Sequence, residues 1–309
     1  MPSLNWNTYI DEFGDYLRLE RSLSENSLKA YLSDIDKLQQ FADVSDWDLS
    51  PVELKQKHLL SFLEYIYNLG MSAPSQARIL AGVKAFYKFL LYRDFIDKDP
   101  SLLLEGPKID RKLPDTLSFV EIEKILSSID LSSGEGIRNR AIIETLYSSG
   151  MRVTELTELR LSNLYIDIGF IRIIGKGNKE RIVPLGQDAL KYIQQYTNHV
   201  RNQLEIQTGQ ENYLFLNRRG SKLSRVMIFN IVRDAAEQAG ITKKVSPHTF
   251  RHSFATHLVE GGANLRAVQD MLGHVSITTT EIYTHLDRDY LRQVITEYHP
   301  RSKRPIKDE

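Results

Sequence analysis

The densest group of side chains able to bind a charged substrate is the segment 246–257, which reads Ser-Pro-His-Thr-Phe-Arg-His-Ser-Phe-Ala-Thr-His. In a helix, His248 and Arg251 lie three residues apart and therefore on one face. Ser246 followed by Pro247 is typical of a helix start, so both side chains would lie near free backbone N–H groups and the positive end of the helix dipole. The segment could therefore bind a phosphate.

Two other interpretations of this segment stay open at the level of sequence. Its polar side chains could simply face water, or His248 and His252, four residues apart, could hold a metal ion. The metal interpretation lacks a glutamate after the first histidine and an obvious third ligand. We therefore predict no metal site.

A second basic group lies at Arg152, which follows closely on a glycine and precedes Glu155 by three residues. Leu156 and Leu159 continue a helical spacing, so Arg152 and Glu155 would share a face at the start of a helix. An arginine held by a carboxylate can offer two fixed N–H donors to phosphate oxygens, which lysine does poorly. The ordinary alternative is a surface ion pair.

Lys176 lies between glycines in a turn that separates two short runs rich in β-branched residues. Residues 170–184 therefore predict a β-hairpin with its tip at residues 175–179. The glycines let the backbone approach a partner closely, and the lysine side chain ends in a proton donor. Lys176 could reach a scissile bond, although a solvated turn lysine is the commoner case.

The segment 272–285 adds a histidine and a tyrosine. His274 follows a glycine, and Tyr283 comes later in a stretch that predicts a helix from about Ser276. A tyrosine hydroxyl can act as a nucleophile that forms a covalent intermediate. Tyr283 is one of 15 tyrosines, so only its neighbours single it out.

All of these side chains belong to the second half of the chain, and the first half shows only helical periodicity. Apolar residues recur every three or four positions over residues 9–19, 26–41, 59–69 and 79–92. Gly70 and Pro74 mark the end of the third helix and the start of the fourth. We predict a helical bundle over residues 1–106.

Prolines and glycines separate this bundle from the second half of the chain. Pro100, Gly106, Pro107 and Pro114 stand among charged residues and disfavour a helix, so we place a linker at residues 107–115. Beyond it, Ser118 with a glutamate three residues later predicts a capped helix, and helical spacing returns over residues 188–200, 226–239 and 247–258. The fold class is thus mainly α with a small β-sheet: the bundle, a second domain over residues 116–300, and a polar tail over 301–309 that we expect to be disordered.

Composition excludes several classes of protein. The absence of cysteine removes disulfides, thiolate metal sites and cysteine nucleophiles. No apolar run approaches the roughly 18 residues that span a membrane, and no signal peptide is recognisable at the amino terminus, so we expect a cytoplasmic protein. The chain has no net charge, but the first 107 residues carry −5 and the remainder +5. The second half is therefore where a polyanion partner would be sought, although many domains carry such an excess without one.

Taken in order, the candidate residues resemble the active-site series of the tyrosine recombinases, the family of phage integrases and Xer proteins. The strings Gly-Met-Arg-Val-Thr-Glu-Leu, Gly-Lys-Gly-Asn-Lys-Glu-Arg, Pro-His-Thr-Phe-Arg-His-Ser and Leu-Gly-His-Val-Ser are similar to the Xer branch in particular. Each motif alone has an ordinary explanation, but their occurrence together and in order is specific. The resemblance implies a SAM-like core-binding domain followed by an α+β catalytic domain.

The resemblance also implies roles for the individual residues. Tyr283 would attack a DNA phosphorus and form a 3′-phosphotyrosine, while Arg152 and Arg251 neutralise the charge of the transition state and His274 adds a hydrogen bond. Glu155 would orient Arg152. The reaction would need no metal and no cofactor.

Two residues would handle protons. His248 would assist proton removal from the tyrosine or hydrogen-bond a nonbridging oxygen, and Lys176 would protonate the departing 5′-hydroxyl. Because one phosphate ester replaces another, a 5′-hydroxyl from a partner duplex could reverse the attack and seal a new junction.

The implied partners are double-stranded DNA and further recombinase subunits, as a tetramer of this chain or with a paralogous recombinase, with an FtsK-like DNA translocase as a possible activator. The apolar stripe of residues 286–298 is expected to dock onto a neighbouring protomer, with packing in cis as its alternative. The implied task is the resolution of chromosome dimers at a dif-like site during chromosome segregation. Alternatives are a mobile-element integrase, a topoisomerase-like relaxase, an inactive DNA-binding protein and a metal-dependent nuclease.

Overall fold

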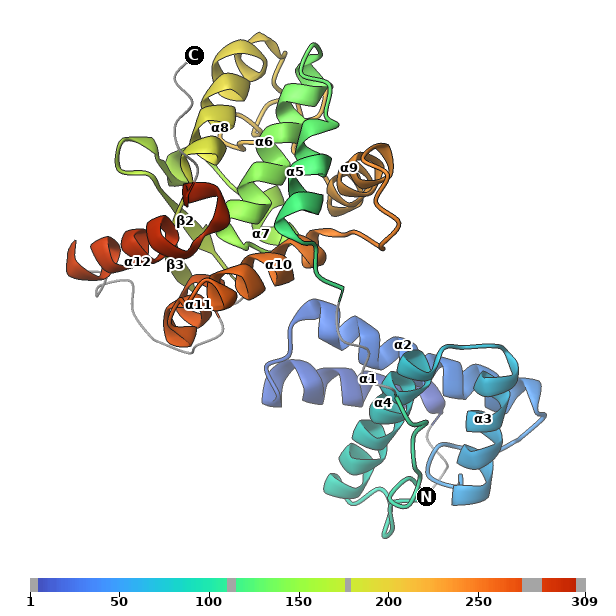
Figure 1. The fold of residues 1–309 in the computed structure, drawn as a ribbon. Coiled ribbons are helices and arrows are strands. Elements are labelled where there is room, and N and C mark those ends of the chain that lie inside the picture. Colours follow the sequence, from blue (N-terminus) through green and yellow to red (C-terminus); the bar gives the residue numbers. More distant parts are fainter. Residues whose placement is uncertain (1–4, 110–114, 176–178, 274–284, 304–309) are drawn as a thin grey trace. The chain divides into compact units, whose positions relative to one another are not determined.

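The computed structural model describes residues 5–109, 115–175, 179–273 and 285–303. The chain divides into two compact units, residues 1–112 and 113–309, so the division falls inside the segment expected to be a linker (Figure 1). Each unit has a hydrophobic core of its own. Within the described residues, no helix is both long and apolar enough to cross a membrane.

The first unit is a helical bundle, as the periodicity predicted. Its helices are α1 (Trp6–Asp15), α2 (Glu25–Val44), α3 (Gln56–Asn68) and α4 (Ala73–Tyr92), and a π-helical turn over Tyr16–Glu20 continues α1. Phe13, Ile35 and Phe86 lie fully buried at its centre. Leu104 is buried in the same core, so the chain stays packed on the bundle beyond Pro100, inside the range 1–106 predicted for the bundle.

The second unit is built around α6 (Gly134–Ser149), a helix buried on nearly every side. It packs against α8 (Gln187–His199) and α10 (Pro247–Glu260), as Figure 1 shows. The other α-helices in the described residues of this unit are α5 (Phe119–Ser127), α7 (Val153–Thr157), α9 (Arg225–Gln238), α11 (Leu265–Leu272) and α12 (His285–Tyr298).

Local capping signals fix where two of these helices begin. The Ser118 hydroxyl accepts a hydrogen bond from the Glu121 N–H, and the Glu121 carboxylate accepts one from the Ser118 N–H, which confirms the predicted capping box of α5. Ser246 caps α10 through the Thr249 N–H, and Pro247 is its first helical residue. The start of α10 is therefore set by sequence, and with it the position of His248 and Arg251.

The predicted hairpin is confirmed and forms most of a small antiparallel sheet. Its strands are β1 (Leu164–Tyr165), β2 (Phe170–Ile174) and β3 (Glu180–Pro184), in the order β1-β2-β3. Ile173 lies opposite Arg181 across β2 and β3. The hairpin closes where the Gly175 N–H donates to the Lys179 carbonyl at 2.7 Å, and the tip residues 176–178 lie outside the described residues.

The structure overturns the expectation for the last helix. Leu291, Val294 and Ile295 of α12 are buried in the core of their own unit, where α12 contacts β3, α10 and α11. An apolar stripe already covered in cis has no free surface to offer, so the expected docking of this face onto a neighbouring protomer is wrong.

The expected disordered tail also begins too early. A 3-10 turn over Pro300–Lys303 follows α12, and Arg301 is buried, with ion pairs to Glu123, Glu144 and Asp188. The polar sequence of this segment suggested disorder, but ion pairs with three carboxylates of the same unit hold Arg301 in place. Residue 301 therefore belongs to the folded unit.

Candidate active site

A glycine turn after α6 brings Arg152 into position. Gly150 has a left-handed backbone (φ 59°), and a Cβ at this position would lie 2.4 Å from the Phe254 ring, so only glycine fits. The turn leads to α7, where the Arg152 N–H donates to Glu155 Oε2 at 2.7 Å and Arg152 Nη1 donates to Oε1 at 3.0 Å. The predicted pair is present, and its carboxylate both caps the helix and holds the guanidinium.

Arg251 reaches the same place from α10. Its side chain is buried, with Nη1 donating to the Gly150 carbonyl at 2.6 Å and Nη2 to the Leu272 carbonyl at 2.8 Å. Burial, together with the positive charge of Arg152, lowers the pKa of Arg251 to about 10. Arg251 therefore stays charged at neutral pH, and the two predicted arginines are electrostatic neighbours.

A third arginine, Arg181 of β3, completes the group and was missed by the sequence analysis. Its Nη1 and Nη2 each donate to one oxygen of Glu155 at 2.8 Å, and its Nε donates to the Met271 carbonyl at 2.7 Å. The sequence does contain a signal that could have identified Arg181. Arg181 alternates with Val183 on the buried face of a hairpin strand, where a charged residue needs a partner.

The charges of this group do not cancel. Burial alone would raise the pKa of Glu155, but the hydrogen bonds and charge of Arg181, with those of Arg152, outweigh it and lower the pKa. One ionised carboxylate is thus held by two guanidinium groups, and the charge of Arg251 lies nearby. The Arg152 side chain is 37% exposed, so an anion from solvent could reach the excess positive charge.

The structure describes only part of the remaining candidate set. His248 is exposed in the first turn of α10, one turn before Arg251. Lys176, His274 and Tyr283 lie outside the described residues.

The described residues just before two of these candidates approach the Glu155 and Arg181 pair. A Cβ on Gly175 would lie 3.5 Å from Glu155 Oε1, and a Cβ on Gly273 would lie 3.2 Å from Arg181 Cδ. The chain therefore runs past the arginine group immediately before the predicted lysine and again before the predicted histidine. Four separate segments of the second unit meet there.

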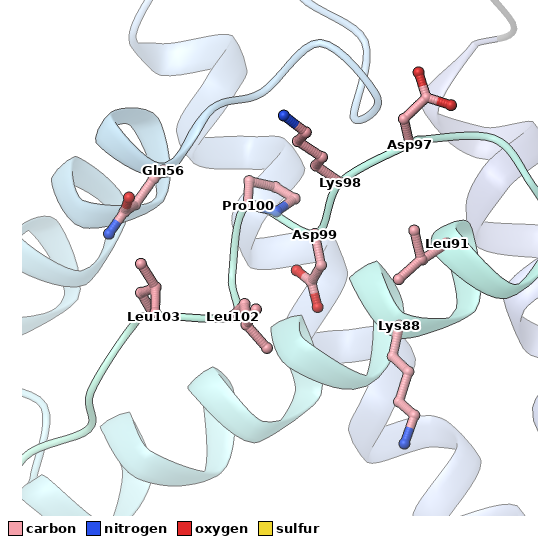
Figure 2. A pocket seen from close by; sticks show the side chains of 9 residues that line it. All are labelled: Gln56, Lys88, Leu91, Asp97, Lys98, Asp99, Pro100, Leu102 and Leu103. Atoms are coloured by element: carbon pink, nitrogen blue, oxygen red, sulfur yellow. The ribbon is translucent and has the colours of Figure 1, made fainter.

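Other features of the described residues compete poorly as a site. No group of three or more His, Cys, Asp or Glu side chains in this part of the chain is arranged to hold a metal ion. A pocket in the first unit is lined by residues of α3, α4 and the segment after α4, including Lys88, Lys98 and the exposed Leu102 and Leu103 (Figure 2). It contains none of the candidate residues.

Comparison with known proteins defines the class. Residues 115–289 match the phage integrase family, and residues 10–94 match the N-terminal SAM-like domain of phage integrases. The first match alone covers more than half of the chain. The chain belongs to the phage integrase family and is a tyrosine recombinase, an enzyme that cuts and rejoins DNA strands.

Within this class the chain is similar to proteins described as tyrosine recombinase XerD. It is 42% identical over 297 residues to the protein of Staphylococcus saprophyticus, covering 96% of this chain and 100% of the relative. It is 40% identical over 296 residues to the Listeria innocua protein, again covering 96% and 100%. The resemblance to the Xer branch is confirmed.

Solved structures share the fold. XerH bound to a palindromic difH substrate in a post-cleavage complex has a TM-score of 0.69 and 24% identity, covering 93% of this chain and 84% of that one. A lambda integrase dimer bound to a COC′ core site has a TM-score of 0.70 and 18% identity, covering 90% and 100%. The expected architecture, a SAM-like helical domain followed by an α+β domain, is confirmed.

Proposed function

We propose that this chain is a site-specific recombinase that joins Tyr283 to a 3′-phosphate of duplex DNA and that it resolves chromosome dimers at a dif-like site during chromosome segregation. The observation that supports the chemistry best is the convergence of Arg152 and Arg251 on one partly open, positively charged group. The similarity to XerD proteins supports the chromosomal role over that of a mobile-element integrase.

The arginines suit a reaction at an anionic phosphorus. A phosphodiester resists attack because its oxygens are charged, and the charge grows in the pentavalent transition state. Arg152 is held by Glu155, and Arg251 by the carbonyls of Gly150 and Leu272. Donors fixed in this way before the reaction cost no reorganisation in the transition state.

The proposed step breaks the bond from phosphorus to the 5′-oxygen and forms one from phosphorus to the Tyr283 oxygen. His248 accepts the phenol proton or hydrogen-bonds a nonbridging oxygen, Lys176 protonates the departing 5′-oxygen, and His274 adds a hydrogen bond to the phosphoryl group. A 5′-hydroxyl from a partner duplex then reverses the attack. One ester replaces another, so no cofactor or nucleotide is consumed.

The proposed assembly is a tetramer on two duplex sites, of this chain alone or with a paralogous recombinase, with an FtsK-like DNA translocase as activator. A chromosomal substrate puts the reaction in the cytoplasm. Since the apolar stripe of α12 is buried in its own unit, contacts between subunits need other surfaces.

Covalent trapping tests this proposal. A nicked duplex carrying the host dif-like site, incubated in EDTA, should give a complex with the wild-type chain that survives denaturation. Tyr283→Phe should bind the same duplex and give none, because the phenol oxygen is the attacking atom. Tyr290→Phe, which changes an exposed tyrosine of α12, is the matched control and should trap normally.

Three results would contradict the proposal or part of it. A covalent adduct in Tyr283→Phe would reassign the nucleophile, and a reaction abolished by EDTA would favour a metal-dependent nuclease. Trapping on the ends of a mobile element, but not on the chromosomal site, would favour the integrase role.

A further inference from the structure

We infer that Arg181 is a positioning residue of the active site, which fixes the Glu155 carboxylate, and through it Arg152, while it anchors the carboxyl end of α11. The inference rests on the proposed function and deepens it. Arg181 does not itself contact the substrate in this proposal, since the whole residue is only 5% exposed.

The first support is the geometry of the guanidinium. Arg181 uses Nη1 and Nη2 for both oxygens of Glu155, each at 2.8 Å. Such a two-point contact fixes the plane of the carboxylate as well as its place. Arg152 contacts the same carboxylate through one guanidinium nitrogen and its backbone N–H, so the direction of Arg152 depends on the plane that Arg181 sets.

The second support is charge. Arg181 and Glu155 form a fully buried pair whose charges match one to one. With Glu155 already matched, the charge of Arg152 is not cancelled by its own carboxylate partner. It therefore remains available to an incoming phosphate, while the hydrogen bonds still hold the side chain in place.

The third support is a link to α11. The last carbonyls of a helix have no hydrogen-bond partner within it. At the end of α11, Arg181 Nε donates to the Met271 carbonyl and Arg251 Nη2 donates to the Leu272 carbonyl. Gly273 has a left-handed backbone (φ 69°), and a Cβ there would lie 3.2 Å from Arg181 Cδ. One side chain thus joins α7 to the helix end that leads to His274.

Stability alone does not account for a charge at this place. The strand position opposite Arg181 is Ile173, and Val183 beside it is buried, so an apolar residue would pack there. Replacing a buried ion pair by apolar groups is often neutral or stabilising. We therefore attribute the arginine at position 181 to its role in orienting the Glu155 carboxylate.

The test compares two nicked substrates that differ only at the scissile phosphate, one natural and one an uncharged methylphosphonate. Arg152→Met should lose most of its activity on the natural substrate. It should lose much less on the methylphosphonate, because a phosphorus without a charged nonbridging oxygen needs only one arginine, Arg251, to offset the charge of the transition state. If Arg181 acts through Arg152, Arg181→Met should show the same pattern, with cleavage slowed on the order of 10²-fold on the natural substrate and largely recovered on the methylphosphonate.

Three further variants keep the test sharp. Glu155→Gln and the double variant Arg181→Met with Glu155→Gln should be no slower than Arg181→Met alone, because the residues act in one chain of contacts. The double variant also leaves no unpaired buried charge, so it keeps the test valid if Arg181→Met alone is too unstable to assay. Arg172→Met, a half-buried arginine of β2 that bonds to Asn163 instead, is the matched control and should cleave normally.

The outcomes separate the two proposals. If the wild-type chain traps no DNA, the proposed function fails. If the wild-type chain cleaves and Arg181→Met cleaves as fast, or if every Arg181 variant is slowed equally on both substrates, the positioning role is overturned and Arg181 supports only the fold.

Discussion

The active site and the carboxyl-terminal anchor of the second unit both bury arginine, but with opposite charge balance. In the active site Arg152 and Arg181 share the single carboxylate of Glu155, and Arg251 adds a third positive charge within electrostatic reach of all three side chains. In the anchor, which we define as Arg301 with its ion-pair partners Glu123, Glu144 and Asp188, one guanidinium meets three carboxylates. The first group has an excess of positive charge that an anion could offset, whereas in the second group the carboxylates outnumber the arginine.

The two buried glutamates show how this difference acts on single groups. Burial raises the pKa of Glu144 and outweighs the charges of Arg301 and Arg140. The pKa of Glu155 is lowered despite burial, because Arg181 and Arg152 provide hydrogen bonds to both of its oxygens. A carboxylate that must remain charged to hold an arginine in place is thus given more donors than one that only joins helices.

The largest expected effect separates chemistry from stability at Arg152. Arg152→Met should slow cleavage on the order of 10³-fold, the usual cost of removing a donor to a transition-state oxyanion. The unfolding temperature should not fall, since the side chain is partly exposed and its loss relieves repulsion with Arg251. Single-turnover cleavage and thermal unfolding measure the two effects, and a variant that is unstable yet fully active would break the comparison.

Sequence predicted those parts of the site that depend on neighbours along the chain. The cap of α10 by Ser246, the capping box of α5 and the pairing of Arg152 with Glu155 all span three residues. Such contacts follow from helix geometry alone. The hairpin followed equally from its turn residues and β-branched runs.

The parts that were missed depend on contacts between distant segments. Arg181 finds Glu155 across 26 positions, and Arg301 finds Glu123 across 178. The burial of the α12 stripe in its own unit is of the same kind. Periodicity shows that a face is apolar, but which surface covers it is decided by tertiary packing.

The second expected effect is a loss of stability without a loss of activity, the opposite of the effect at Arg152. Arg301→Met should lower the free energy of unfolding by about 3 kcal/mol, because the buried Glu144 loses one of its two arginine partners and the ion pairs to Glu123 and Asp188 are lost as well. Cleavage at low temperature should persist, since the anchor provides no donor to the arginine group. Denaturant unfolding measures the loss. Arg233→Met, which removes exposed ion pairs on α9, is the control and should unfold like the wild type.

The smallest effect concerns His299, which is buried beside the anchor and contacts the Tyr147 carbonyl through Nε2 at 3.4 Å. Burial lowers its pKa to about 3, against an ordinary value of 6.5. Between these values the unfolded chain binds a proton that the folded chain does not, so stability falls as pH falls below about 6.5. At about 1.4 kcal/mol per pH unit, the loss from this group reaches about 2 kcal/mol near pH 5. Burial also lowers the pKa of His257, which adds a loss in the same direction.

Comparing the acid-induced loss of stability in the wild type and in His299→Gln isolates the contribution of His299. Denaturant unfolding at pH 7 and at pH 5 should show a smaller acid loss in His299→Gln than in the wild type, because glutamine takes up no proton. Equal acid losses in the two chains would show that His299 is not the group that titrates. Arg251 of the active site does not change charge in this range, since its lowered pKa is about 10. Acid therefore removes the stability that the neutral His299 contributes beside the anchor, while Arg251 keeps its positive charge. The raised pKa of Glu144 acts in the opposite direction, because the folded chain binds that proton first.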